Sequence, residues 1–326
     1  MENTSHCCFF DTTVFNQILP PVLILEFIFG LFGNTLVLWI FAFYMEDWKP
    51  NSIYLVHLAV ADTMVLFCLP FRADYFLRGK DWIYGDAFCR ILLFLQASNR
   101  AASIFFLTAV TVDRYLKIVH PLHRINRMNL TYAQWVSCGL WISIIAFTAD
   151  LLTYNHSNYN NRTQCETFNI CLGNNPVANW NRAFYVMEFF VPANIIIFCT
   201  ARITRQLKDN TMDTQGKIKR VIKFIYVVAL VFTICFFPST ITQVAVLILK
   251  TQYNQCQNFH EASVAFHTSL CFTYFISILN PLVYYFASPT FSKTFQKLVM
   301  KFRGNTSGEQ VPEINARPAT ITDNLH

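Results

Sequence analysis

Long apolar runs separated by short polar stretches dominate the chain. Seven such runs lie at roughly 22–43, 52–75, 87–119, 133–152, 182–207, 218–249 and 261–286. Each is near or above the ~20 residues with which an α-helix crosses the hydrocarbon of a bilayer. The pattern predicts an all-α membrane protein whose residues 22–288 form a bundle of seven transmembrane helices.

The segments that flank the bundle differ in pattern. Residues 1–21 form an N-terminal segment, and residues 303–326 are polar and predicted to be disordered. Between the bundle and this tail, residues 289–302 place apolar side chains and lysines on opposite sides of a helix: Phe291, Phe295, Leu298 and Phe302 against Lys293, Lys297 and Lys301. We expect a short amphipathic eighth helix on the inner membrane surface, in contact with lipids.

Composition and charge support a membrane protein and orient it. Hydrophobic residues make up 54% of the chain and charged residues only 13%, whereas ordinary globular domains carry about 25% charged residues. The net charge of +6 comes mainly from Lys and Arg near the segment ends on one side. The positive-inside rule then predicts an extracellular N-terminus and a cytoplasmic C-terminus. No nucleic-acid-binding motif is present, so these basic residues are expected to face lipid headgroups.

Cysteines and glycosylation signals fall mostly on the predicted outer side. Six cysteines lie there: Cys7, Cys8, Cys89, Cys165, Cys171 and Cys256. An even number of cysteines in an oxidising compartment predicts three disulfides, and the sequence alone leaves the pairing open. Three N-glycosylation signals, at Asn3, Asn155 and Asn161, lie on the same side.

Arg100 lies inside the third apolar run, in "LFLQASNRAASIFFLTAVTVDRY". A guanidinium keeps its charge in a protein, and placing one at this depth costs at least ~2.5–3.5 kcal/mol. Two explanations follow from the residues themselves. One is an internal ion pair with Glu188 or Glu26; the other is an anchor for the carboxylate of a ligand, which a planar guanidinium binds through two bonds.

A second polar group is predicted deep in the bundle, from Asp62, Asn99, Ser103 and Asn280. Asn99 and Ser103 are four residues apart and therefore share a helix face. Together with a buried Asp they supply oxygen ligands for a small hard cation, and a polar network filled with water is the alternative. We expect no other metal, because His260 and His267 are isolated in the sequence.

An ordered set of motifs connects these segments to a known family. The motifs are Gly33-Asn34, "LAVAD" ending at Asp62, Asp113-Arg114-Tyr115, "FTICFFP" ending at Pro238, and "NPLVYY" from Asn280 to Tyr285. Over residues 20–302 the chain resembles the rhodopsin-class G-protein-coupled receptors. Within that class, "HCCFF", "SNRAAS" and "MEFFVP" resemble the hydroxycarboxylic acid receptors, and their sister, the oxoeicosanoid receptor, shares several of these features.

The resemblance implies roles for individual residues. Arg100 would anchor the ligand acid, and Tyr274, Thr167, Phe168 and His267 would contact the ligand, although ordinary packing is the alternative for these four. The segment "FHTSL", which contains His267, is more similar to the oxoeicosanoid receptor. The cation site would hold sodium, with Asn280 standing where an Asp is common, and no other cofactor is implied.

The resemblance also implies disulfides and a cytosolic switch. The pairs would be Cys89–Cys165, Cys7–Cys171 and Cys8–Cys256. The residues of the switch that faces the G protein would be Asp113, Arg114, Tyr115 and Tyr284. Asp113 would hold Arg114 in the inactive state, but "GKIKRVIKF" lacks the usual acidic partner on the sixth segment. Without that partner the inactive state would be held only weakly, which predicts raised basal activity. The alternative is that the lysines of this segment only contact lipid headgroups.

The implied function is a plasma-membrane receptor for a carboxylic acid such as lactate or hydroxybutyrate. It would signal through inhibitory heterotrimeric G proteins, with arrestin as a further partner. A receptor for a long-chain oxo- or hydroxy-eicosanoid is the alternative within the same fold. A transporter would show internal repeats, and a retinal pump would need a lysine in the last segment; neither is present. No zinc or nucleophile motif is present either, so we expect no enzyme.

Overall fold

The computed structural model describes residues 13–45, 48–123, 130–153, 158–159, 162–163, 165, 176–209, 215–250 and 256–305. The long helices are α1 (Thr13–Phe43), α2 (Pro50–Leu66), α3 (Leu69–Leu77), α4 (Asp86–Val119), α5 (Leu130–Thr148), α6 (Pro176–Asp209), α7 (Gln215–Lys250), α8 (Cys256–Ala287) and α9 (Pro289–Asn305). A 3-10 turn, η3 (Ala149–Leu152), continues α5, and β1 (Asn158–Tyr159) pairs antiparallel with β2 (Arg162–Thr163).

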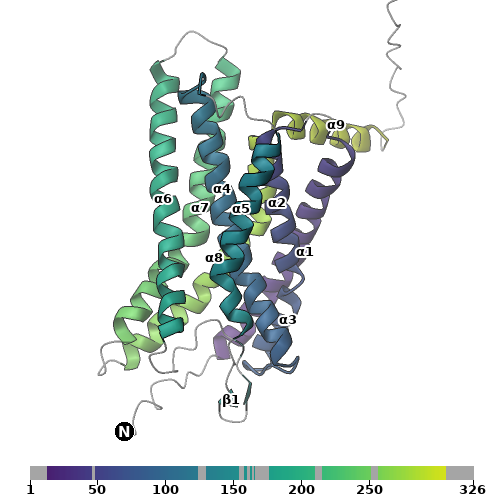
Figure 1. Cartoon of the computed structure of the whole chain (residues 1–326). Coiled ribbons are helices and arrows are strands. Elements are labelled where there is room, and N and C mark those ends of the chain that lie inside the picture. The colour runs from purple at the N-terminus through teal and green to yellow at the C-terminus, as the bar shows by residue number, and fades with distance from the viewer. Residues whose placement is uncertain are drawn as a thin grey trace, which may run out of the picture.

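Seven spans in the described part of the chain are long and apolar enough to cross a membrane. They run side by side, and α9 lies across the end of the bundle opposite to β1 (Figure 1). The predicted all-α bundle of seven transmembrane helices is therefore confirmed. One span, Pro50–Leu77, consists of two helices, because α2 ends just before Pro70 of α3, and a proline supplies no backbone N–H to continue the ladder.

The helix ends differ from the ranges that hydropathy alone suggests. The structure begins α1 at Thr13 and ends α9 at Asn305, whereas the apolar pattern placed these boundaries at residues 22 and 302. Helices extend beyond the hydrocarbon with polar residues, which an apolar pattern does not detect. The position of α9 at the bundle end fits its alternating phenylalanines and lysines.

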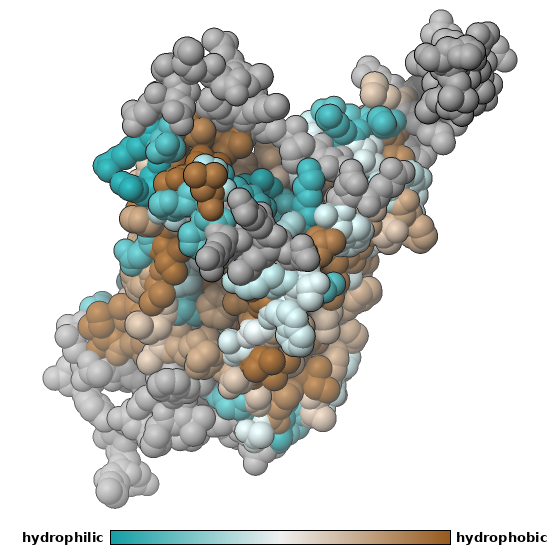
Figure 2. Space-filling view, turned by 45° about the horizontal axis from the view of Figure 1, so that its top comes forward, coloured by the Kyte–Doolittle hydropathy of each residue, from teal (hydrophilic) through white to brown (hydrophobic). Residues whose placement is uncertain are grey.

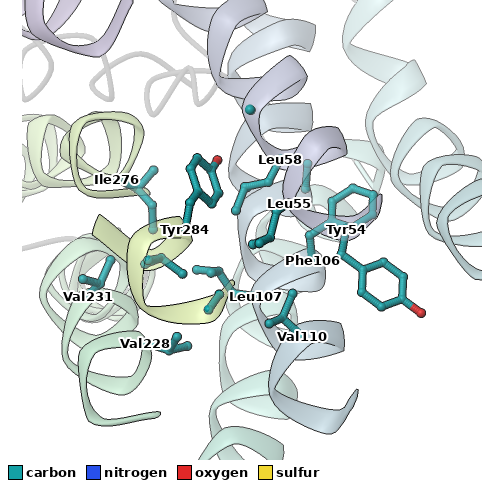
Figure 3. Close-up of a cluster of buried hydrophobic side chains, with 14 of the residues drawn as sticks. Tyr54, Leu55, Leu58, Phe106, Leu107, Val110, Val228, Val231, Ile276 and Tyr284 are labelled. Atoms are coloured by element: carbon teal, nitrogen blue, oxygen red, sulfur yellow. The ribbon is translucent and has the colours of Figure 1, made fainter. Parts of the chain in front are cut away.

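The centre of the bundle is a cluster of buried hydrophobic side chains, and Figure 3 shows the part of it that α2, α4, α7 and α8 contribute. Its members include Leu55 and Leu58 of α2, Phe106, Leu107 and Val110 of α4, Val228 and Val231 of α7, and Ile276 and Tyr284 of α8. Apolar side chains cover the flank as well, as the brown surface in Figure 2 shows. Phe32, Phe43 and Trp135 are each more than 70% exposed, as expected for side chains that face lipid.

Buried polar groups connect helices that are distant in sequence. The Asn34 amide of α1 donates to the Gly30 carbonyl at 2.9 Å and to the Ser277 carbonyl of α8 at 2.7 Å. Beside it, a methyl group on Gly33 would lie 3.0 Å from Pro281. The close approach of α1 to α8 therefore requires a residue without a side chain at position 33.

At the outer end, a disulfide between Cys89 and Cys165 attaches the chain after β2 to the start of α4. This is one of the three pairings that the resemblance implies. The Arg72 side chain of α3 donates to the backbone carbonyl of Cys165. These contacts fix the outer wall of the cavity described next.

Candidate functional site

A cavity of about 80 Å³ lies among α3, α4, η3, α6 and α8. Its charged lining residues are Arg72, Arg100, Glu188 and Asp150, and its other polar residues include Gln96, Tyr185, His267 and Tyr274. Phe147 of α5 and Phe184 of α6 stack on one side, with ring centroids 4.3 Å apart. The cavity therefore combines aromatic walls with two guanidinium groups.

The Arg100 guanidinium is buried and bonded on every edge. Its Nε donates to Glu188 Oε1 of α6 at 2.5 Å. Its two terminal nitrogens donate to Ser239 Oγ and Thr240 Oγ1 of α7, both at 3.0 Å. The Tyr185 ring lies 3.8 Å from the guanidinium carbon. One residue of α4 thus links α6 and α7 in the interior of the bundle.

This geometry decides between the two candidate partners for an internal ion pair. Glu188 is the partner of Arg100. Glu26 of α1 is fully buried, but both of its carboxylate oxygens lack a hydrogen-bond partner among the described residues. Arg100 still lines the cavity, so the internal pair and the proposed contact with a ligand involve different edges of the same guanidinium.

Each of the two hydroxyl partners of Arg100 also makes a hydrogen bond within its own helix. Ser239 and Thr240 each also donate to the Phe236 carbonyl of their own helix, at 3.1 and 2.9 Å. They therefore remain hydrogen-bonded without Arg100. Because a carboxylate accepts from a guanidinium more strongly than a neutral hydroxyl does, an entering acid can replace them, whereas Glu188 would keep its bond to Nε.

Arg72 is a second buried cation in the cavity wall, and the sequence analysis missed it. It donates to the Cys165 carbonyl and lies 5.0 Å from the Tyr75 ring and 5.4 Å from the Phe76 ring. No carboxylate of the described residues lies within ion-pair distance of it. A basic residue within the apolar span 50–77 was the available signal. Among the described residues, its partners are the Cys165 carbonyl and two aromatic rings.

The structure brings together two further residues that the sequence suggested. Tyr274 and His267 of α8 line the same cavity as Arg100. Thr167 and Phe168 lie outside the described residues. So do Asn3, Asn155, Asn161, Cys7, Cys8 and Cys171, and the side chain of Cys256. Lys80 lies in the turn after α3 with a positive φ of 64° and does not line the cavity.

The four predicted cation-site residues belong to one buried cluster. Asp62 Oδ1 accepts from Asn99 Nδ2 at 3.0 Å and from Ser277 Oγ at 2.9 Å, and Oδ2 accepts from Asn280 Nδ2 at 2.6 Å. Ser103 Oγ is buried nearby on the Asn99 face without a partner among the described residues. Sequence analysis did not select Ser277, which lies three residues before Asn280 and is only visible as a partner in the fold.

The donor set fits a small hard cation. One carboxylate, two amides and two hydroxyls supply oxygen atoms, and the Oδ1 of Asn280 and the Oγ of Ser103 have no partner among the described residues. The Tyr284 ring is beside Asp62, although its hydroxyl makes no hydrogen bond of normal geometry. Asp62, Asn280 and Ser103 are the residues that would hold sodium.

The switch residues adopt an arrangement that differs from the one that the resemblance implies. Asp113 accepts from Lys117 Nζ at 2.8 Å, one turn further along α4. Arg114 instead donates from Nη2 to the Ala287 carbonyl at the end of α8, at 2.9 Å. Tyr115 pairs with His120 at 3.1 Å. Asp113 therefore does not hold Arg114 here, because Lys117 competes for the same carboxylate.

Comparison with known proteins supports the family resemblance. The family described as 7 transmembrane receptor (rhodopsin family) matches residues 33–284. The chain is 45% identical over 297 residues to human hydroxycarboxylic acid receptor 3, covering 90% of this chain and 76% of that protein. It is 40% identical to human hydroxycarboxylic acid receptor 1, with 90% and 83% coverage. Human oxoeicosanoid receptor 1 is 35% identical, with 93% and 76% coverage.

The Arg100–Glu188 pair predicts a specific pattern of stability. Arg100→Ala strands a buried carboxylate, which should destabilise the receptor by about 3–5 kcal/mol. Arg100→Leu combined with Glu188→Leu removes both charges and should recover most of that loss. Thermal unfolding of the detergent-purified receptor measures both effects.

Arg78→Ala provides the control, because it breaks the exposed pair with Asp74 and should change stability little. If Arg100→Ala unfolded at the same temperature as this control, or if removing Glu188 recovered nothing, the pair would not stabilise the bundle.

Proposed function

The chain belongs to the rhodopsin family of seven-transmembrane receptors, and we propose that its ligand is a short hydroxycarboxylic acid. As a member of this family it is a multi-pass plasma-membrane receptor that acts through heterotrimeric G proteins on binding a small molecule, and it is not an enzyme. Lactate and hydroxybutyrate are the candidate ligands. The N-terminus is extracellular, in agreement with the distribution of Lys and Arg.

The observation that carries this proposal is the charge on the cavity wall. Arg72 and Arg100 both line one small cavity, and among the described residues Arg100 has a carboxylate partner whereas Arg72 has none within ion-pair distance. An isolated charge in an apolar interior is costly, and an opposite charge with good hydrogen-bond geometry offsets that cost. An anion that binds between the two guanidinium groups gains from both.

A carboxylate fits the available edges of these groups. At Arg100, Glu188 occupies Nε, and the terminal nitrogens are bonded to neutral hydroxyls. These two nitrogens can take a bidentate carboxylate in place of Ser239 and Thr240. Arg72 adds an uncompensated positive charge from α3. Arg100 therefore remains the anchor that the resemblance implies, while Glu188 fixes its orientation.

The size of the cavity favours a short acid over an eicosanoid. Its volume is about 80 Å³, which is small for a binding cavity. A hydroxy acid such as lactate or hydroxybutyrate is of this size, whereas a twenty-carbon chain is far larger. The three hydroxycarboxylic acid receptors of human are also more similar to this chain than the oxoeicosanoid receptor is.

Two further proposals concern regulation and partners. Coupling to inhibitory G proteins, with arrestin as a second cytosolic partner, follows from the resemblance to these receptors. The release of Arg114 from Asp113 by Lys117 supports a weak cytosolic lock and hence raised basal activity. Sodium bound by Asp62, Asn280 and Ser103 would act against activation by favouring the inactive state.

The role of Arg72 is tested by Arg72→Gln, which retains a donor for Cys165 and removes the charge. The acid should lose at least ~30-fold in potency, because a charge-assisted contact in a shielded site contributes roughly 2–5 kcal/mol. The measurement is acid-stimulated nucleotide exchange on purified G protein at equal amounts of receptor.

Arg78→Gln is the matched control, since Arg78 lies at the end of the same helix but is exposed and bonded to Asp74. Its potency should stay within ~2-fold of wild type. Equal potency of the two variants would show that Arg72 does not meet the acid.

The sodium proposal predicts that the ion and an agonist oppose each other's binding. Sodium should weaken agonist binding, because an ion that favours the inactive state must oppose a ligand that favours the active state. Asp62→Asn should abolish this dependence. The proposal fails if wild-type agonist affinity is the same in sodium and in a large organic cation at equal ionic strength.

A further inference from the structure

The structure assigns a second recognition residue to the cavity: we propose that the side-chain amide of Gln96 binds a hydroxyl or oxo oxygen of the ligand. This inference rests on the proposed function, because it concerns the same ligand whose carboxylate meets Arg72 and Arg100. It names the ligand class more narrowly, as acids that carry a second oxygen near the carboxylate.

Gln96 is a buried polar side chain whose Nε2 lacks a partner among the described residues. It is 8% exposed, and its Nε2 makes no hydrogen bond to any described residue. Nearly all buried polar groups in proteins are hydrogen-bonded, and leaving a donor unsatisfied costs as much as losing a bond. Gln96 also lines the cavity, so a molecule bound there is the available partner.

The position of Gln96 matches a two-point contact with a short acid. Gln96 precedes Arg100 by four residues on α4, so both side chains share one face, and Gln96 lies one turn nearer the outer end. One turn corresponds to roughly 6 Å along the helix axis. A single small molecule can therefore place its carboxylate at Arg100 and Arg72 and a second oxygen at Gln96.

The chemistry of the amide admits both a hydroxyl and an oxo group. A primary amide offers two N–H donors and one carbonyl acceptor, and it can present either end to the ligand. A hydroxyl can donate to the carbonyl or accept from the N–H, and a ketone can accept from the N–H. A plain short fatty acid offers neither and would leave the amide unsatisfied, which gives the site a basis for selecting oxygenated acids.

Both oxygens of Glu26 and the Oε1 of Gln243 also lack a hydrogen-bond partner among the described residues, but neither residue lines the cavity. Asp150 and Tyr185 do line it, and each takes part in other interactions. Gln243 provides a matched control for Gln96. It is 1% exposed on α7, so Gln243→Leu makes the same chemical change as Gln96→Leu in a buried position outside the cavity.

The experiment compares each oxygenated acid with its parent acid on wild type, Gln96→Leu and Gln243→Leu. The probes are lactate and pyruvate against propionate, and 3-hydroxybutyrate against butyrate, in G-protein nucleotide exchange at equal receptor amounts. For at least one oxygenated acid, Gln96→Leu should reduce potency about 5- to 10-fold more than for the parent acid, the loss expected for one neutral hydrogen bond. Gln243→Leu should show no such difference.

Stability of the ligand-free receptor gives a second readout. Gln96→Leu removes an unsatisfied donor, so its unfolding temperature should be equal to or above that of wild type. Equal losses for oxygenated and parent acids on Gln96→Leu would overturn this inference, while the proposed function would stand if Arg72→Gln still reduced the potency of the acid by at least ~30-fold. If no acid of the set acted on wild type, the proposed function would fail and this inference with it.

Discussion

A permanent positive charge inside a membrane-spanning bundle requires compensation, and the interior is organised around that requirement. Arg100 obtains it from Glu188 at 2.5 Å and from two hydroxyls of α7. Because the guanidinium is planar and rigid, these bonds fix where α4, α6 and α7 approach one another. The pair with Glu188 balances the charge, and the neutral hydroxyls leave two donors that an anion can use more effectively.

The buried polar groups lie at different depths in the bundle and have different proposed roles. Arg72, Gln96 and Arg100 line the cavity towards one end of the bundle, Asp62 and its amide partners lie nearer the middle, and Arg114 reaches the end of α8 at the opposite end. Several of the residues concerned lie on α4. A ligand that changes the bonds of Arg100 to α7 therefore acts on a helix pair whose inner end carries the cytosolic switch.

The sequence was sufficient to predict the fold, but it did not show which side chains pair with the individual charged residues. Hydropathy gave all seven spans, because crossing hydrocarbon requires continuous apolar length. It could not choose between Glu188 and Glu26, since the choice depends on how α1 and α6 face α4. It also missed Arg72 and Gln96, whose importance follows from their place in the cavity wall of the folded state. The pairing of Asp113 with Lys117 has the i,i+4 spacing of a helical ion pair, so the sequence contained this signal although the family motif directed attention to Arg114.

The most direct test compares the binding of an acid with that of its neutral amide, lactate against lactamide, on wild type and on Arg72→Gln. Competition binding at equal receptor amounts gives the coupling between the ligand charge and the arginine charge. If the carboxylate meets Arg72, wild type should prefer lactate by at least ~10-fold and Arg72→Gln should lose most of that preference, since both changes remove the same contact. An unchanged preference in Arg72→Gln would contradict a carboxylate placed between Arg72 and Arg100.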